Sequence, residues 1–510
     1  MIQAETAFAA LEGLLDFAQA HGLIEAQDRL YYRNLLMDAL KYDAPIEAIA
    51  MPLAETATKA LDVLAEDAQK RGVIGEGQTE KELFTARLMG LVTPSPKQVR
   101  ETFQKICDTK GSQAALGWFY QLCRDCDYIR VDQIARNIRY FADTPAGELE
   151  ITINLSKPEK DPKEIAKLKN APQVGYPKCM LCPENPGYAG RANFPARQNH
   201  RMIPLKLAGQ DWFVQYSPYL YYNEHCIVLN SQHVPMKIDR GTFERLFDFV
   251  GQFPGYFLGS NADLPIVGGS ILNHDHFQGG NYLFPMDKAP VKTKLAAPVE
   301  GVEASILDWP MSCLCLKGRE PQKLIDAADQ VLAAWRGWSD AENDILAQTE
   351  QGPHNTITPI LRRENDQYKL MLVLRNNRTT QECPLGIFHP HAPLHHIKKE
   401  NIGLIEVMGL FILPGRLKEE IKELTGYLTG EKPMVCPDEG DASYKHYPWM
   451  EELAAKYGTA LSLEEADKVL HDEMALICAQ VLADAGVYKQ TEKGLKGMLA
   501  FLNSLGYKEA

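Results

Sequence analysis

The segment GGSILNHDHFQGG, residues 268–280, places two histidines and a glutamine at strict two-residue spacing. In extended backbone, His274, His276 and Gln278 would project from one face. A neutral imidazole can attack phosphorus and carry a nucleotidyl group between two partners, while a glutamine amide can donate to the phosphoryl oxygens. The flanking glycines would let a phosphate approach the backbone. The spacing therefore predicts a phosphoryl-transfer site, and an HxH metal site without a nucleophile is the open alternative.

A second motif, CMLC, places Cys179 and Cys182 in a turn within a Pro- and Gly-rich loop. Such a turn can direct two thiolates at one ion, with the other tetrahedral positions filled from distant strands. We expect zinc here, with His233 in NSQHVPM and His274 as the remaining ligands. This closed Cys2His2 site would brace the histidine strand without activating water. A redox-active cysteine pair is the rival interpretation, and His233 could instead be a surface loop residue.

Other cysteines and histidines are less informative. Cys123 and Cys126, in QLCRDCDYI, are expected at unrelated helical positions, and Cys313 and Cys315 in a buried strand. The run FHPHAPLHHIKK is compatible either with a metal site or with a Pro-rich loop that leads to a substrate-facing helix. Its histidines are His389, His391, His395 and His396.

Length and composition limit the classes of protein. A chain of 510 residues is too long for one compact core and predicts two to four structural units. A net charge of −13 and a pI near 5.6 argue against binding nucleic acid or an acidic membrane surface, but they allow a local basic pocket for a phosphate ligand. No membrane span or signal sequence is recognisable, and eleven dispersed cysteines suit a reducing compartment, so a cytoplasmic location is expected.

The helices and strands that must position these motifs are predicted from the spacing of apolar residues and from the Pro and Gly residues that interrupt it. Residues 1–145 are expected to be mainly helical, with helices over 58–71 and 81–91 and another that starts at Pro96 and runs toward Cys107. The charged run at 157–170 predicts a surface excursion. Strands are expected over 149–155, in RMIPLKL, DWFVQYS, EHCIVLN and the histidine segment, and in QYKLMLVLRNN.

Between these strands, GTFERLFDFVGQFPGYF predicts one amphipathic helix, and ENIGLIEVMGLFI predicts a helix or a buried segment. The tail is expected to be helical and broken at KPMVCPDEG. The fold class is thus α+β. We expect a helical N-terminal region over 1–145, mixed regions over 146–300 and 301–413, and a helical tail over 414–510.

Taken together, YPKCMLCPENPGYAGRANFPARQNHRMIPL, EHCIVLNSQHVPM and GGSILNHDHFQGG resemble the galactose-1-phosphate uridylyltransferases over essentially the whole chain. The resemblance is to the second, bacterial class of UDP-glucose–hexose-1-phosphate uridylyltransferases. It implies two histidine-triad-like α/β halves and an exchange of UMP between UDP-glucose and galactose 1-phosphate. It further implies structural zinc, no organic cofactor and a homodimer.

The first class of this family carries a His-Pro-His-Gly-Gln motif, and the corresponding run here is 274–278. The resemblance makes His276 the nucleophile and Gln278 the contact to the transferred phosphoryl group, and it assigns zinc to the same four residues. A carbonyl hydrogen bond to the other nitrogen of His276 would fix its tautomer. Asp275 and Phe277 depart from the motif. The second metal of the first class is expected to be absent, because the matching strand at 367–377 has no histidine.

Further substrate contacts are expected where phosphate or sugar would lie, although each residue could instead be a surface position. These residues are Ser270, the nearest match to a serine that precedes the first-class motif, and Asn273, Arg191, Arg197, Asn199, Arg375 and Asn377. Three rival functions stay open. They are a nucleotide phosphorylase or adenylyltransferase of the same superfamily, a zinc-stabilised binding protein without turnover, and a redox protein that uses Cys179 and Cys182.

Overall fold

The computed structural model describes residues 2–156 and 174–510, so the excursion expected at 157–170 lies outside the described residues. The chain divides into two compact units. Among the described residues, the first unit comprises 2–136, 174–234 and 274–280, and the second comprises 137–156, 235–273 and 281–510. Both helices and sheets contribute, which confirms the α+β class.

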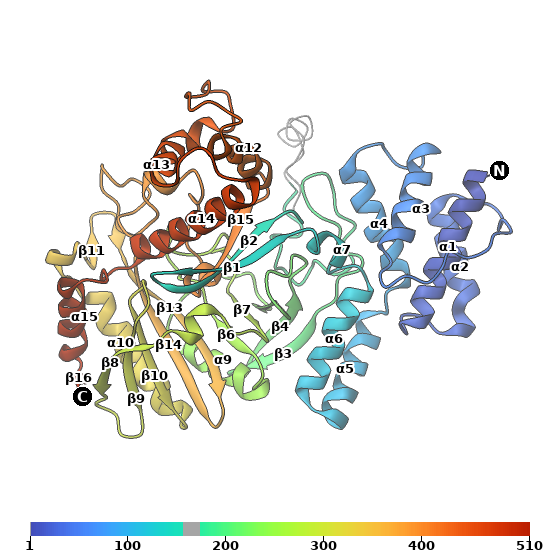
Figure 1. Ribbon diagram of the computed structural model, residues 1–510. Helices are drawn as coiled ribbons and strands as arrows, with labels where there is room; N and C mark the ends of the chain where they lie inside the picture. The colour runs from blue at the N-terminus through green and yellow to red at the C-terminus, as the bar shows by residue number, and fades with distance from the viewer. Residues whose placement is uncertain (1, 157–173) are drawn as a thin grey trace. The chain divides into compact units, whose positions relative to one another are not determined.

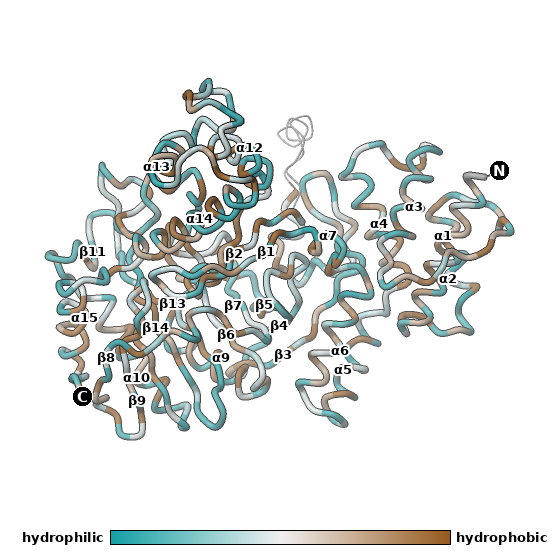
Figure 2. Tube along the Cα trace, viewed as in Figure 1, coloured by the Kyte–Doolittle hydropathy of each residue, from teal (hydrophilic) through white to brown (hydrophobic). Residues whose placement is uncertain are grey.

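The first unit begins with helices, drawn in blue in Figure 1. The predicted helices over 58–71 and 81–91 and the helix that begins at Pro96 are confirmed. Ser95 and Gln98 form a capping box at the start of the last of these, with Pro96 in its first turn. Figure 2 shows both hydrophilic and hydrophobic stretches along these helices, as amphipathic packing requires. The helices are α1 Ile2–Ala20, α2 Arg29–Leu40, α3 Thr58–Lys70, α4 Gln78–Val92, α5 Pro96–Lys110, α6 Ser112–Asp125 and α7 Val131–Ile134.

Four antiparallel strands complete the first unit, in the order β7-β5-β4-β3. They confirm the four predicted strand segments and are β3 Ile203–Leu207, β4 Gln210–Tyr216, β5 Cys226–Asn230 and β7 His276–Gly280. One expectation is wrong, because β7 starts only at His276. His274 lies in the bend before it, since the backbone of Asp275 bonds to Asn230 and Val234 instead of continuing the ladder. Phe277, on the opposite face of β7 from His276, stacks on Trp212 with ring centroids 5.1 Å apart.

The second unit contains a three-stranded sheet and a larger, seven-stranded set of strands. Strands β1 Ile138–Thr144, β2 Gly147–Asn154 and β15 Leu410–Pro414 form one, with β15 parallel to β2. The other has the order β16-β8-β9-β10-β14-β13-β6. Its strands are β16 Lys508–Glu509, β8 Val291–Ala296, β9 Glu303–Leu307, β10 Cys313–Gly318, β14 Gln367–Asn376, β13 Asn355–Glu364 and β6 Phe257–Gly259. The strands predicted at 149–155 and 367–377 and the burial of Cys313 and Cys315 on β10 are confirmed.

Helices α9 Arg240–Gln252 and α10 Pro321–Gly337 pack against this larger sheet. The helix predicted over 241–257 is too long, because it ends before Pro254 and the chain then enters β6. The segment at 400–412 divides into helix α11 Leu404–Val407 and the start of β15. Short elements are the two-stranded pair β11 Gln348–Thr349 and β12 Gly352–Pro353, and the 3-10 helices η1 Ala26–Asp28, η2 Pro285–Lys288, η3 Ala341–Asn343, η4 Ala392–Leu394 and η5 Tyr444–His446.

The tail is helical, as predicted, with a break that includes KPMVCPDEG. Its helices are α12 Leu417–Thr429, α13 Tyr447–Tyr457, α14 Leu463–Ala485 and α15 Glu492–Ser504. Among the described residues, no helix has both the length and the apolar character that a bilayer crossing requires.

Candidate active site and metal centre

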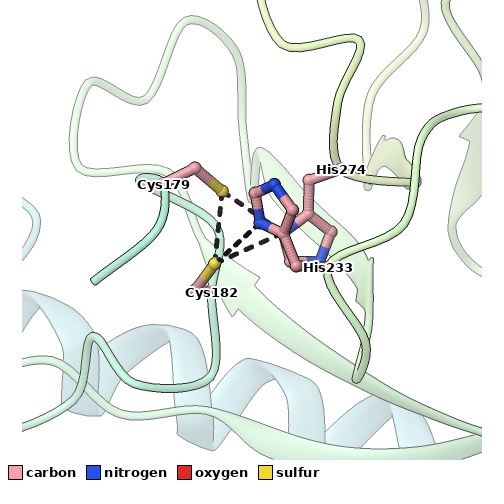
Figure 3. Close-up of side chains that lie close together, drawn as sticks. All are labelled: Cys179, Cys182, His233 and His274. Carbon is pink, nitrogen blue, oxygen red and sulfur yellow. Dashed lines mark hydrogen bonds between the residues drawn. The ribbon is translucent and has the colours of Figure 1, made fainter. Parts of the chain in front are cut away.

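Cys179, Cys182, His233 and His274 converge in the first unit, and their ligand atoms all lie within 4.8 Å of one another. Figure 3 shows the two sulfurs facing the two imidazoles. The residues come from three segments: the loop before β3, the chain just after β5 and the bend before β7. The structure therefore brings together all four ligands expected from the sequence.

The spacing of these atoms fits one tetrahedral ion. Sγ of Cys179 lies 3.5 Å from Sγ of Cys182 and 3.2 Å from Nδ1 of His274, and Sγ of Cys182 lies 3.1 Å from Nδ1 of His233. Ordinary Zn–S and Zn–N bond lengths place tetrahedral ligand atoms about 3.3–3.8 Å apart. These three separations differ from the tetrahedral values by a few tenths of an ångström, and side chains supply all four donor atoms.

Neighbouring groups orient these ligands. Nε2 of His274 donates to the carbonyl oxygen of Asn230 at 2.8 Å, so the lone pair on Nδ1 faces the sulfurs. The side-chain amide of Asn185 donates to the carbonyl oxygens of both Cys179 and Cys182, which holds the turn. Burial and the adjacent Cys179 raise the pKa of the Cys182 thiol to about 12. Without a cation this thiol therefore stays protonated near pH 7, whereas a divalent metal, the cation that this donor set prefers, would bind the sulfurs as thiolates.

His276 begins β7 and is only 6% exposed. Its Nδ1 donates to the carbonyl oxygen of His274 at 2.8 Å, as expected, and the lone pair therefore lies on Nε2. Burial lowers the pKa of this imidazole to about 4, so the ring is neutral near pH 7. The geometry provides a neutral ring in which Nδ1 is fixed by a carbonyl and Nε2 carries the lone pair.

Gln278 follows on the same face of β7, two residues along the strand. Its Oε1 lies 3.2 Å from Nε2 of His225, a buried residue just before β5. The strands set this contact, because Ile227 pairs with Gln278 and Cys226 pairs with Gly279. A neutral imidazole and a side-chain amide thus share one face of one strand.

The other expected substrate residues of the first unit have mixed surroundings. The guanidinium of Arg191 donates to Asn193, to the hydroxyl of Tyr188 and to backbone carbonyls of its own loop. Asn199 donates to the carbonyl oxygen of Cys126. Arg197 lies over the ring of Tyr128, and its buried Nε has no hydrogen-bond partner among the described residues. Of these three side chains, Arg197 therefore has the most hydrogen-bond donors available for a ligand.

The remaining expected substrate residues belong to the second unit. Arg375 is 1% exposed and donates to Thr358 and to the carbonyl oxygen of Ile402, and burial lowers its pKa to about 10. The side-chain oxygen of Asn377 lies 2.8 Å from Nδ1 of His354. Ser270 and Asn273 are exposed.

Comparison with known proteins identifies the family. The sequence matches "Galactose-1-phosphate uridyl transferase, N-terminal domain" over residues 23–235 and the C-terminal domain of the same name over residues 249–436. The chain belongs to the galactose-1-phosphate uridylyltransferase family. A galactose-1-phosphate uridylyltransferase from Caldanaerobacter subterraneus is 50% identical, with all of both chains covered. The enzyme of that name from Bacillus subtilis is 46% identical over 98% of each chain, and that from Fusobacterium nucleatum is 47% identical over 97% of this chain and 98% of its own.

Among solved structures, yeast Ap4A phosphorylase Apa2 aligns over 69% of this chain and 98% of its own, with 12% identity and a TM-score of 0.33. Agreement at that level assigns neither fold nor activity. Membership of the uridylyltransferase family therefore rests on the full-length sequence matches.

Sequence reasoning missed one residue beside the site of this family member, His225. Its side chain meets Gln278 across 53 residues of sequence, and only the pairing of β5 with β7 brings the two together. The only signal for it in the sequence is that it is a histidine within the strand predicted for EHCIVLN, which does not show what its side chain contacts.

Proposed function

We propose that this chain transfers UMP from UDP-glucose to galactose 1-phosphate and carries the uridylyl group on Nε2 of His276. The observation on which this proposal depends is the hydrogen bond from Nδ1 of His276 to the carbonyl oxygen of His274, which leaves the lone pair on Nε2. The relatives named galactose-1-phosphate uridylyltransferase, matched over nearly their full length, support the choice of substrates.

In the first step, Nε2 of His276 attacks the α-phosphorus of UDP-glucose. A new P–N bond forms, the bond to the bridging oxygen breaks, and glucose 1-phosphate leaves with the electron pair. The ring becomes positively charged as it is uridylylated, and the carbonyl oxygen of His274 stabilises that charge through Nδ1–H. The amide of Gln278 donates to a non-bridging oxygen in the transition state.

In the second step, a phosphate oxygen of galactose 1-phosphate attacks the same phosphorus. The P–N bond breaks, UDP-galactose is released and His276 returns to its neutral form. Each displacement inverts the configuration at phosphorus, so the overall exchange retains it. No proton has to leave the imidazole during the cycle, which agrees with the fixed tautomer.

We further propose that the metal of the Cys2His2 cluster is zinc. The four residues leave no open position for water, so the ion would brace the structure. His274 connects the two sites, because its Nδ1 faces the cluster and its backbone carbonyl holds His276. A bound ion would therefore stiffen the acceptor that fixes the tautomer of the nucleophile.

Several expectations stay predictions. They are the substrate contacts of Ser270, Asn273, Arg191, Arg197, Asn199, Arg375 and Asn377, the homodimer, the cytoplasmic location, the lack of nucleic-acid partners, and the domain boundaries near residues 145, 300 and 413. They form part of the proposal.

The function is tested by following sugar phosphates in both directions. With UDP-glucose and galactose 1-phosphate, we expect equal amounts of UDP-galactose and glucose 1-phosphate. We also expect exchange of labelled glucose 1-phosphate into UDP-glucose in the absence of galactose 1-phosphate, because a covalent intermediate makes each half-reaction reversible. Turnover that requires inorganic phosphate, or that prefers an adenine nucleotide donor, would instead support the phosphorylase or adenylyltransferase alternative.

A further inference from the structure

The buried His225, just before β5, and the half-buried Gln278, on β7, form a side-chain pair in the first unit. Nε2 of His225 lies 3.2 Å from Oε1 of Gln278, and His225 is 2% exposed. No other hydrogen bond of either side chain is found within residues 2–156 and 174–510, and Nδ1 of His225 is buried without a partner there. The single contact therefore decides how both side chains are oriented.

The position of the proton on His225 follows from the surroundings of its two nitrogens. Burial keeps the ring neutral, so it carries one N–H. A proton on Nδ1 would bury an unpaired donor, which folded proteins avoid, whereas a proton on Nε2 pairs with Gln278. Nε2–H is therefore the donor, and Gln278 must present its oxygen to His225.

The ring of His225 is itself held in place. It packs against Tyr222 with centroids 4.4 Å apart and against Tyr221 at 5.6 Å. The backbone of His225 bonds to Ser217 and to Tyr222, and the hydroxyl of Tyr222 donates to the carbonyl oxygen of Gly279. The donor is thus fixed relative to β7, the strand that carries Gln278 and His276.

We propose that His225 is a positioning residue for the transfer reaction: by binding Oε1 of Gln278, it turns the amide NH2 toward the transferred phosphoryl group. Without this contact, the amide could rotate and present its oxygen to the anionic phosphoryl group, which would be repulsive. The role rests on the function proposed above. It adds that one buried histidine selects the orientation in which Gln278 can act as a donor.

The test compares His225→Phe, His225→Gln and His225→Asn in the full-length, metal-loaded protein. The phenylalanine keeps the ring and removes the donor, so kcat should fall about ten- to a hundredfold while KM changes less than about threefold. The glutamine amide reaches the position of Nε2 and should restore kcat to within about fivefold of wild type, whereas the shorter asparagine reaches the position of Nδ1 and should not.

A double-mutant cycle separates positioning from general damage. In a Gln278→Leu background, His225→Phe should cause no further loss of kcat, because there is no amide left to orient. A matched control is His200→Phe. His200 is also buried, and its Nε2 lies 2.9 Å from Oε1 of Gln215 on β4. This variant should lower Tm comparably but leave kcat within about threefold of wild type.

The proposal is overturned if His225→Phe keeps wild-type kcat, if its loss is equally large without Gln278, or if the folded glutamine variant is as slow as the phenylalanine variant. An equal loss in His200→Phe would also overturn it. A wild-type protein that does not exchange UMP would instead refute the proposed function, so the two failures are distinguishable.

Discussion

The histidines of the first unit and the histidine run of the second unit are held in different ways. In the first unit, the rings of His274 and His276 each bond to a backbone carbonyl through one nitrogen. The other nitrogen of His274 faces the sulfur of Cys179, and the other nitrogen of His276 carries the lone pair. In the second unit, His391 and His395 direct Nε2 to local carbonyl oxygens, and Nδ1 of His391 lies 3.3 Å from Asp484. The two groups of histidines are therefore held by different kinds of partner.

His396 continues this contrast. Its Nδ1 lies 2.8 Å from Nδ1 of His446, whose Nε2 lies 3.1 Å from Glu420. Arg416 and Lys445 also bind this carboxylate. His396 and His446 thus belong to a polar network around Glu420, whereas Nε2 of His276 keeps its lone pair.

The largest effect is expected at His276. His276→Gly should lower exchange by at least about 10⁴-fold, because the variant lacks the imidazole that we propose to carry the uridylyl moiety. Its matched control is His395→Gln in the second-unit run, which should change exchange less than about threefold. Initial rates of UDP-galactose formation measure both. A His395 variant as inactive as the His276 variant would break the contrast between the two regions.

The next effect concerns the metal. Cys182→Ser should reduce bound zinc from about one ion per chain to nearly none and lower the free energy of unfolding by at least about 3 kcal/mol. Cys123→Ala tests the other CxxC, at the end of α6, and should leave the zinc content unchanged. Elemental analysis and urea unfolding provide the measurements. Full zinc occupancy in Cys182→Ser would contradict the assigned ligand set.

The smallest effect is expected at Glu420, and it depends on pH. Burial opposes ionisation, but hydrogen bonds from His446 and Lys445 and the charge of Arg416 lower the pKa of this carboxyl to about 2, from an ordinary value near 4.5. The stabilisation is therefore fully present above about pH 4.5 and is lost as the pH falls toward 2.

Glu420→Gln should accordingly lower the free energy of unfolding by at most about 3 kcal/mol at pH 7. The difference from wild type should shrink between pH 5 and pH 3, while exchange at pH 7 changes little. Urea titrations of both proteins across this range provide the check. If this difference in the free energy of unfolding instead grew as the pH fell, the predicted pH dependence would have the wrong sign.

Much of the fold can be predicted from the sequence where several features of neighbouring residues favour the same element. Ser95, Pro96 and Gln98 mark a helix start through one capping box, and the apolar run of β14 forms the buried strand it predicts. The four cluster residues were found from ligand chemistry and spacing. These cases share one cause: the physical preference acts within a few residues or on a small set of side-chain types.

The sequence predictions fail where contacts between residues far apart in the sequence determine the local structure. His274 leaves the strand because Asp275 pairs its backbone with residues 230 and 234, and the three-residue strand β6 is too short to show a period. His225 could not be assigned because its role depends on which strand lies beside β7. Sequence patterns give the residue types and the spacing of apolar residues, but they do not give the order of the strands in a sheet.

The most direct test is to mix the protein with UDP-glucose labelled in the α-phosphate, without an acceptor, and to map the bound label. We expect about one acid-labile label per chain on the peptide that contains His276, with an equal amount of glucose 1-phosphate released. Label on any other residue, or full exchange activity with no label retained, would contradict the covalent mechanism.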